Sequence, residues 1–212
     1  EFRRVLFRSD WKLALALAYK VVQYSETLAA MYRSMVVREV VKGTSQALWD
    51  KYIQLGINAV EEKRDKELLD LIAKAIDEFN AIEIKNEKPL VVGLIGEIYI
   101  KYNSFGQLGI THWLQQQGIE VVVPSLMSFL LQSFVNNRVN HNNNIERTSI
   151  IERTFTKGLQ MYIESRDHRW EKLKEKFRFY RPEPNIFEIA KDASQVINLV
   201  NQFGEGWLIA GE

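Results

Sequence analysis

The stretch "LVVGLIGEIYIKYNSFGQLG", residues 90–109, decides the fold. It opens as a continuous apolar run with β-branched members, which predicts a strand over 90–96 covered on both faces. A helix is expected over 107–117. The run "IEVVV", residues 119–123, predicts a second buried strand that ends at Pro124. Two parallel strands joined through one helix make a right-handed crossover, so we expect a Rossmann-like β-α-β unit.

The fold class predicted around this unit is α/β: helix-rich, with a small parallel sheet. Residues 10–86 read as a helical segment and 87–212 as a Rossmann-like α/β segment. A two-strand sheet is thin, so we expect the second segment to be incomplete at its C-terminal end. The first nine residues, "EFRRVLFRS", resemble the translation of a short sequencing adapter. We therefore expect 1–9 to be a non-native leader and the chain to be a metagenomic fragment.

Helical periodicity runs on both sides of the predicted sheet. Before it, Trp11 to Gly43 fits two helices or one kinked helix, and a short helix from Thr44 or Ser45 to Tyr52 is closed by Gly56. An amphipathic helix then carries its apolar stripe on Leu68, Leu69, Ile72, Ile76 and Phe79. After the sheet, Ser125 caps a helix, the Asn-rich tract 135–147 reads as a polar loop, and helices are expected over 150–163, 170–179 and 186–203.

Composition limits the possible functions. The chain has 212 residues with 28 basic and 27 acidic side chains, a net charge of +1, so no global field indicates nucleic acid or an anionic membrane as a partner. No apolar run approaches the length of a membrane span. The absence of Cys excludes disulfides, thiolate nucleophiles and Cys-ligated metal within this piece. We expect a cytoplasmic protein without nucleic-acid or membrane partners.

The glycines after the first strand do not form a phosphate-binding motif. The order G-L-I-G-E lacks the third glycine of a dinucleotide fingerprint and the G-K-[ST] ending of a P-loop, and an acid at the turn would repel phosphate. The turn does follow the carboxyl end of a strand, where open α/β sheets place ligands. The alternative is structural: Asn103 or Ser104 caps the helix and Glu97 pairs with a Lys. The candidate ligand edge comprises Gly96, Glu97, Tyr99, Tyr102, Asn103 and Ser104.

A second candidate block lies near the end of the chain, where Gly204 and Gly206 free the backbone around Glu205. "WLIAGE" is expected to start a helix, whose N-terminus favours an acid, so a structural cap is one interpretation. The other is that Glu205, with Trp207, faces the same crevice as Glu97. The hypothesis is that the two carboxylates converge at one cleft.

Residues 166–181, "RDHRWEKLKEKFRFYR", place basic side chains among aromatic ones. That mixture suits single-stranded nucleic acid or the adenine and phosphates of coenzyme A. Trp170, Leu173 and Phe177 at helical spacing also predict an ordinary core-facing helix. The histidines, His112, His141 and His168, are too scattered for a metal site or a nucleophile elbow. No metal ligands and no complete catalytic constellation are identified.

The block "VVGLIGEIYIKYNSFGQLGITHWLQQQGIEVVVPSLMSFL" resembles the proteins related to 2-hydroxyacyl-CoA dehydratases and their ATP-dependent activases, in which a strand runs into "GEIY", then Arg or Lys, "YNPF", a helix and "GIEVV". "NQFGEGWLIAGE" resembles that family's "GEGWLL" block, and "REVVKGTSQAL" its weaker E-x-x-x-G segment. The match departs at Asn103-Ser104, where the family has Asn-Pro.

The resemblance implies doubly wound domains, a [4Fe-4S] cluster on Cys ligands in the full-length protein, and ATP-dependent radical removal of water from a 2-hydroxyacyl-CoA. It implies a fragment of such a lyase system, with its missing domains or dehydratase and activase subunits as partners and an acyl-CoA as ligand. The fragment has no cofactor ligands of its own and is expected to be inactive in isolation. A non-catalytic docking or scaffold domain, and an unrelated small-molecule- or nucleotide-binding α/β module, remain alternatives.

Overall fold

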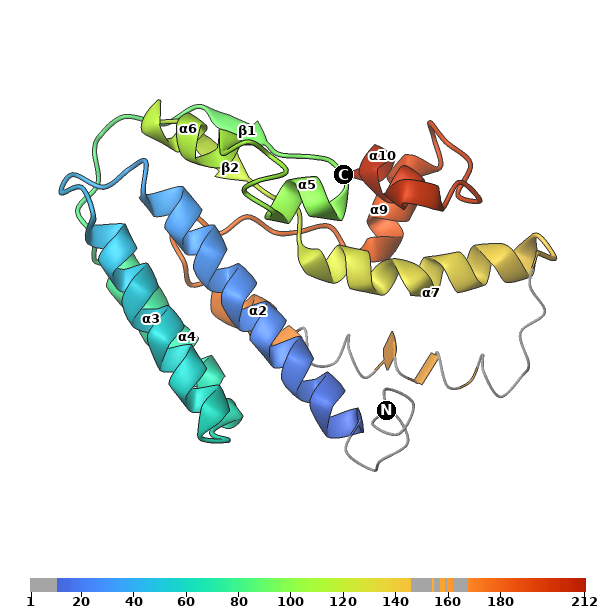
Figure 1. Cartoon of the computed structure of the whole chain (residues 1–212), viewed down its shortest axis with the longest axis horizontal. Coiled ribbons are helices and arrows are strands. Elements are labelled where there is room, and N and C mark those ends of the chain that lie inside the picture. The colour runs from blue at the N-terminus through green and yellow to red at the C-terminus, as the bar shows by residue number, and fades with distance from the viewer. Residues whose placement is uncertain (1–10, 146–153, 155–156, 159, 162–167) are drawn as a thin grey trace.

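A computed structural model describes residues 11–145, 154, 157–158, 160–161 and 168–212. Helices α2, α3 and α4 lie side by side, a two-strand sheet with α6 lies across one end of them, and α7, α9 and α10 form a second group (Figure 1). In chain order the elements are α2 (Trp11–Met35), α3 (Thr44–Glu61), η1 (Asp65–Glu67), α4 (Leu68–Asn80), β1 (Val91–Gly93), α5 (Ile98–Tyr102), α6 (Ile110–Gln116), β2 (Glu120–Val122), α7 (Leu126–Asn142), α9 (Ile186–Ala193), η2 (Phe203–Glu205) and α10 (Gly206–Gly211).

The N-terminal helices differ in extent from the sequence pattern. α2 is one continuous helix that ends at Met35, before Gly43, and within it the Ser25 hydroxyl donates to the carbonyl of Val22. α3 continues to Glu61, well beyond the predicted end at Tyr52, so Gly56 lies inside the helix. The Tyr24 ring packs so closely on Gly56 that a Cβ there would overlap it. This glycine therefore serves helix packing and not a turn.

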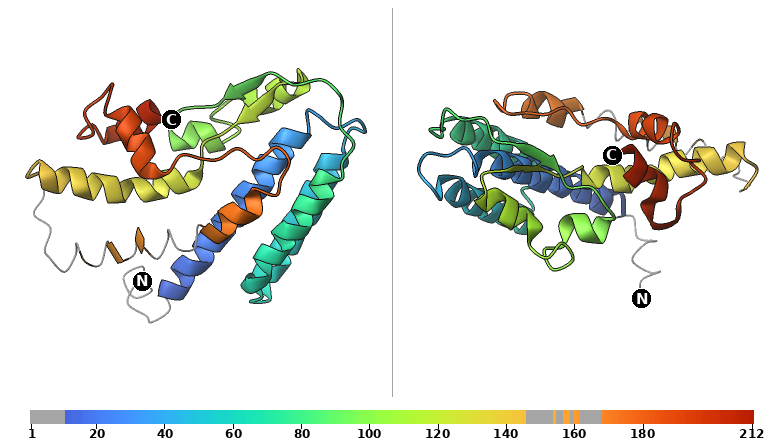
Figure 2. Two further views of the ribbon diagram at one scale, coloured as in Figure 1. Left: turned by 180° about the vertical axis from the view of Figure 1, so that it is seen from behind. Right: turned by 90° about the horizontal axis from the view of Figure 1, so that it is seen from above.

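The first hydrophobic core joins α2, α3 and α4. The predicted stripe of α4 is confirmed, with Leu68, Ile72, Ile76 and Phe79 almost completely buried. The helical residues 168–174 cover the same core from behind α2, as Figure 2 shows, and bury Trp170 there. The predicted helix over 170–179 is thus shorter and gives way to turns before Phe177, which packs into this core as well.

The sheet is parallel, as predicted, with Val91 opposite Glu120 and Gly93 opposite Val122. Each strand has three residues, so the prediction of a strand over 90–96 is too long. The prediction that this strand is covered on both faces is also wrong, because β1 is exposed at both ends. Glu120 and Val121 of β2, in contrast, are buried. Among the described residues, β1 pairs only with β2. Because α2 packs against β2, the second strand is the more buried of the two.

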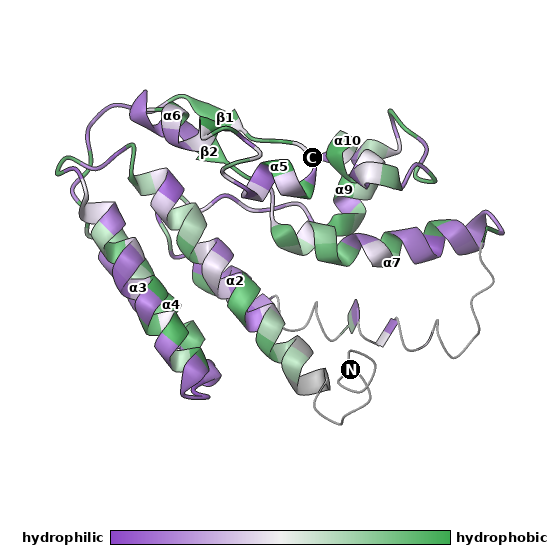
Figure 3. Ribbon diagram, in the orientation of Figure 1, coloured by the Kyte–Doolittle hydropathy of each residue, from purple (hydrophilic) through white to green (hydrophobic). Residues whose placement is uncertain are grey.

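The second hydrophobic core joins α7, α9 and α10 around Trp207. Most of the Asn-rich tract is helical and not a loop, because α7 continues to Asn142, although its second half is hydrophilic (Figure 3). The Trp207 indole donates to the Asn136 side chain at 2.8 Å, and Val135 is buried against the same core. These tertiary contacts outweigh the weak helix preference of Asn.

The C-terminal helices also differ from expectation. α9 begins with a capping box at Asn185 but ends at Ala193, so the predicted helix over 186–203 is less than half as long. "WLIAG" is helical as predicted, in α10. Residues 1–9 and most of the predicted helix 150–163 lie outside the described part of the chain. None of the described helices is long and apolar enough to cross a membrane.

Candidate functional site

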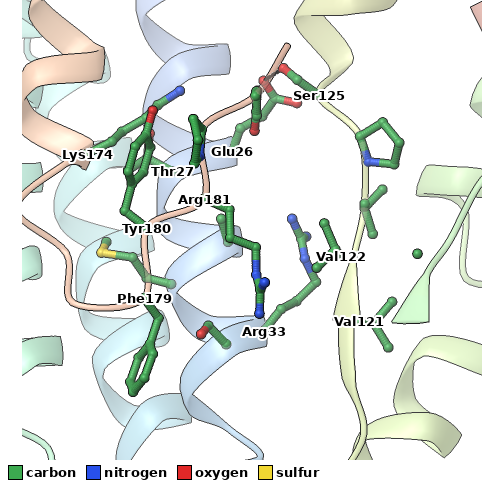
Figure 4. Close-up of a pocket in the computed structure, with 18 of the residues that line it drawn as sticks. Glu26, Thr27, Arg33, Val121, Val122, Ser125, Lys174, Phe179, Tyr180 and Arg181 are labelled. Atoms are coloured by element: carbon green, nitrogen blue, oxygen red, sulfur yellow. Dashed lines mark hydrogen bonds between the residues drawn. The ribbon is translucent and has the colours of Figure 1, made fainter. Parts of the chain in front are cut away.

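A cavity of about 330 Å³ lies between α2, the carboxyl ends of both strands and residues 177–184. Its polar lining faces inward from opposite walls in Figure 4, with α2 behind and the strand to one side. The size is at the lower end of the range for small-molecule sites. The charged residues that line it are Glu26, Arg33, Glu120, Lys174, Arg181, Glu183 and Glu212.

Local structure explains this position. The carboxyl ends of parallel strands meet at one edge of a sheet, and Gly93 and Val122 both line the cavity there. Glu26 and Arg33 are seven residues apart on α2, which places them two helical turns apart on one face. Pro124 then turns the chain away from the sheet and into α7.

Glu120 binds two arginines at the wall of the cavity. Its Oε2 accepts from Arg38 Nη2 and from Arg181 Nη2, each at 2.7 Å. Burial alone would raise the pKa of Glu120, but the hydrogen bonds and charges of the two guanidinium groups outweigh it and hold the pKa below its usual value. This pairing fixes the segment that contains Arg181 against the first residue of β2.

Glu26 connects α2 to the start of α7. Its carboxylate accepts from the Ser125 hydroxyl at 2.7 Å and from the backbone N–H of Leu126. Burial raises the pKa of Glu26 in spite of these hydrogen bonds. The carboxylate therefore caps a 17-residue helix from outside its own segment.

Arg33 is a cationic side chain of the cavity that no neighbouring acid in the described structure pairs with. Within the described residues it forms no hydrogen bond and no ion pair, although it is half-buried and lines the cavity. Burial lowers the pKa of its guanidinium, and the negative charges of Glu26 and Glu183 offset this only in part. In Figure 4 its side chain extends from α2 toward the strand. A partly desolvated guanidinium without an acid partner is suited to bind an anion.

Two of the sequence-predicted residues, Glu97 and Glu205, are brought together by the structure. Glu97 accepts from the backbone N–H of Tyr99 at 2.9 Å, and Glu205 Oε1 accepts from that of Ile98 at 2.9 Å. Both carboxylates therefore cap the first turn of α5. Glu205 is buried, has φ of 61° and leaves its Oε2 without a hydrogen bond in the described structure.

Neither these two carboxylates nor the other predicted residues line the cavity, and most of the others have structural contacts. The Asn103 side chain accepts from the N–H groups of Phe105 and Gly106, and the Tyr102 hydroxyl donates to the carbonyl of Pro124. Tyr99 is exposed. Gly96 and Gly204 adopt positive φ angles of 154° and 58°, and Gly206 lies close against Asn201. The Ser104 carbonyl accepts a hydrogen bond from the N–H of Gly109. Trp207 fills the second core.

Glu212 reaches the cavity from the last helical turn of the described chain. Its carboxylate accepts from Lys101 Nζ at 2.7 Å through both oxygens, and both side chains are 1% exposed. Burial raises the pKa of Glu212, and the nearby Glu205 raises it further, against the lowering effect of Lys101. The pairing joins α10 to α5 beside the site.

Glu39 accounts for the E-x-x-x-G segment in structural terms. Its two carboxylate oxygens accept from the backbone N–H groups of Gly43 and Ser45, each at 2.7 Å. Gly43 adopts a left-handed conformation with φ of 93°, which favours glycine. This motif therefore caps α3 and contributes nothing to the cavity.

Some of the basic and aromatic residues of 166–181 fit the core-facing helix, and others fit the anion-binding interpretation. Trp170 and Phe177 are buried in the first core, as the structural alternative predicts, and residues 166–167 lie outside the described chain. Lys174 and Arg181 nevertheless line the cavity. Sequence reasoning missed Glu26, Arg33 and Glu212. The available signal for the first two was an acid and a base seven residues apart on one helix.

Among the described residues, no group of His, Asp and Glu is arranged to hold a metal ion. No family model, curated protein or solved structure matches this chain. The site is therefore interpreted from its own chemistry.

Proposed function

We propose that this chain is the ligand-binding α/β part of a protein related to the 2-hydroxyacyl-CoA dehydratases, and that its cavity holds a small molecule bearing a carboxylate or phosphate. The observation that carries the binding role is Arg33, a half-buried guanidinium that lines the cavity without an ion pair in the described structure. The dehydratase context is supported by the "GEIY" and "GEGW" blocks alone. Since the chain has no Cys to ligate a [4Fe-4S] cluster, the proposed role is binding and not electron transfer.

The other charged residues that line the cavity are four acids and two bases, and most of them already have partners. Arg181 shares Glu120 with Arg38, so two guanidinium groups face one carboxylate. Glu26 is engaged as the cap of α7 and Glu212 by Lys101. An incoming anion would therefore meet acids that already have partners and a base that has none within hydrogen-bonding distance in the described structure.

Calorimetric titration with malonate and inorganic phosphate tests this proposal. Arg33→Gln should weaken binding about ten- to a hundredfold, because hydrogen bonds to charged groups contribute about 1.5–3 kcal/mol. Arg33→Lys should restore part of the affinity. The control is Arg64→Gln, the same change at an exposed guanidinium far from the cavity in sequence. Equal affinities for the wild type and Arg33→Gln would refute the proposal, and ATP binding without any effect of acyl-CoA would favour an unrelated nucleotide-binding module.

A second candidate function is docking against the rest of a multidomain protein. It is favoured by large apolar side chains that stay exposed around α5 and α6: Tyr99 at 53%, Phe105 at 80%, Leu108 at 90% and Trp113 at 54%. Exposed apolar groups gathered near one another mark contact surfaces. Light scattering over a concentration series should show self-association that the double change Phe105→Ser and Leu108→Ser reduces. A monomer at all concentrations would remove this support.

A further inference from the structure

A second cavity, of about 360 Å³, adjoins the one that contains Arg33. The two are bordered by the same group of residues: Ser125, Ser128, Lys174, Glu183 and Pro184. These shared residues lie between two compartments of similar size, and we call them the neck. A ligand larger than a simple anion could therefore enter both.

One side of the second compartment is apolar. Apolar side chains from α7 and α9 supply much of its wall: Met127, Leu131, Phe134, Ile186 and Phe187. Two of its polar members have local duties, since the Asn185 side chain caps α9 and Glu171 accepts from Lys174 and the Tyr180 hydroxyl. This compartment is suited to an apolar group.

The neck itself can accept one polar contact. Ser128 is 8% exposed, borders both compartments, and its hydroxyl forms no hydrogen bond with the described residues. A ligand that passes through the neck can offer it a partner. Along the two cavities the lining is cationic at Arg33 and contains Ser128 with the charged Lys174 and Glu183 at the neck. Beyond the neck, the apolar side chains of α7 and α9 lie opposite polar residues.

We propose that the natural ligand is an amphipathic acid, whose anionic head binds Arg33 and whose apolar chain of several carbons occupies the compartment between α7 and α9. This inference rests on the proposed anion-binding function and names the ligand class. It requires the two cavities to act as one site.

A series of straight-chain acids tests the inference with the 212-residue protein: butyrate, hexanoate, octanoate and decanoate, each below its micelle concentration, titrated by calorimetry. Affinity should rise about fourfold for each methylene that enters the second compartment, from the transfer free energy of a buried methylene. The rise should stop when the compartment is full. Arg33→Gln should weaken every member of the series by a similar factor.

Phe134→Glu is the variant that separates the two compartments. Phe134 is half-buried in the second cavity, so a carboxylate there should abolish the dependence on chain length and leave butyrate binding unchanged. Leu130→Glu, on the same helix but 48% exposed and outside both cavities, is the matched control and should keep that dependence.

The possible failures are distinct. Wild-type binding of all acids with equal affinity would overturn the amphipathic ligand and leave the anion site standing. Identical behaviour of Phe134→Glu and Leu130→Glu would do the same, because the chain would then lie elsewhere. Absence of binding by any acid, together with no binding of malonate or phosphate, would remove the anion site itself.

Discussion

Replacing Glu120 by Gln should be among the most destabilising changes of an acid in this protein. The side chains of Glu120 and Arg38 are 3% and 8% exposed, so the change would leave a buried guanidinium without its counter-charge. Breaking a buried pair in this way costs about 3–5 kcal/mol. Arg181 is 47% exposed on its side of the same carboxylate, so Arg181→Gln should cost at most about 1 kcal/mol.

Urea unfolding followed by tryptophan fluorescence measures these differences. The matched control is Glu78→Gln, which breaks a pair with Lys51 whose side chains are 41% and 48% exposed and should cost no more than about 1 kcal/mol. If Glu120→Gln destabilised the protein no more than Glu78→Gln, the Arg38–Glu120 pair would not hold β2 to the segment that follows α2.

The pH dependence gives the same prediction a second test. The folded pKa of Glu120 is lowered, so its contribution to stability is fully present above the unfolded value, about 4.3. That contribution is lost as the pH falls through the lowered folded pKa. Wild type and Glu120→Gln should therefore converge in stability on acidification, and a difference that persisted at the lowest pH would contradict the electrostatic explanation.

Three other changes test separate features. Gly211→Ala should destabilise by about 1–3 kcal/mol in urea unfolding, since a Cβ there would overlap the backbone of Ile189, and an unchanged midpoint would mean that α10 does not pack as described. Arg33→Leu should raise the free energy of unfolding by about 0.5–2 kcal/mol in the absence of anions, because it removes a charge that is costly to bury, and a loss of stability would indicate a hidden partner. Glu183→Gln should tighten malonate binding in calorimetry by removing a competing negative charge near Arg33, and weaker binding would show that Glu183 helps to form the site.

The sequence supports the parallel strand pair but not its extent. A continuous apolar run with β-branched members predicted a strand to residue 96, yet β1 ends at Gly93. A strand with one neighbour has an open edge, and Ile95 beyond its end is 47% exposed. Neither the number of neighbouring strands nor their burial is encoded in the local pattern.

The predicted helix boundaries were wrong where contacts between residues far apart in the sequence decide them. Local preference ends α3 at Gly56 and makes a loop of the Asn-rich tract, but Tyr24 packs on the first and Trp207 hydrogen-bonds to Asn136 in the second. Each partner lies tens of residues away. A single sequence carries no direct sign of such pairings.

None of the residues that the sequence predicted for the ligand edge lines the cavity. The carboxyl edge of the sheet does border the cavity, through Gly93 and Val122, but Glu97 is used to cap α5. Arg33 acquires its significance only when α2 passes beneath the sheet and residues 177–184 close the other side. That arrangement brings together segments nearly 150 positions apart, which periodicity and spacing cannot reveal.

A crystal structure of the protein grown with selenate, with the selenium located by its anomalous scattering, tests the central claim most directly. We expect the strongest peak beside the Arg33 guanidinium, between α2 and the carboxyl ends of β1 and β2. A structure in which Arg33 forms a close ion pair with Glu183 and selenate lies elsewhere would contradict the anion-binding account.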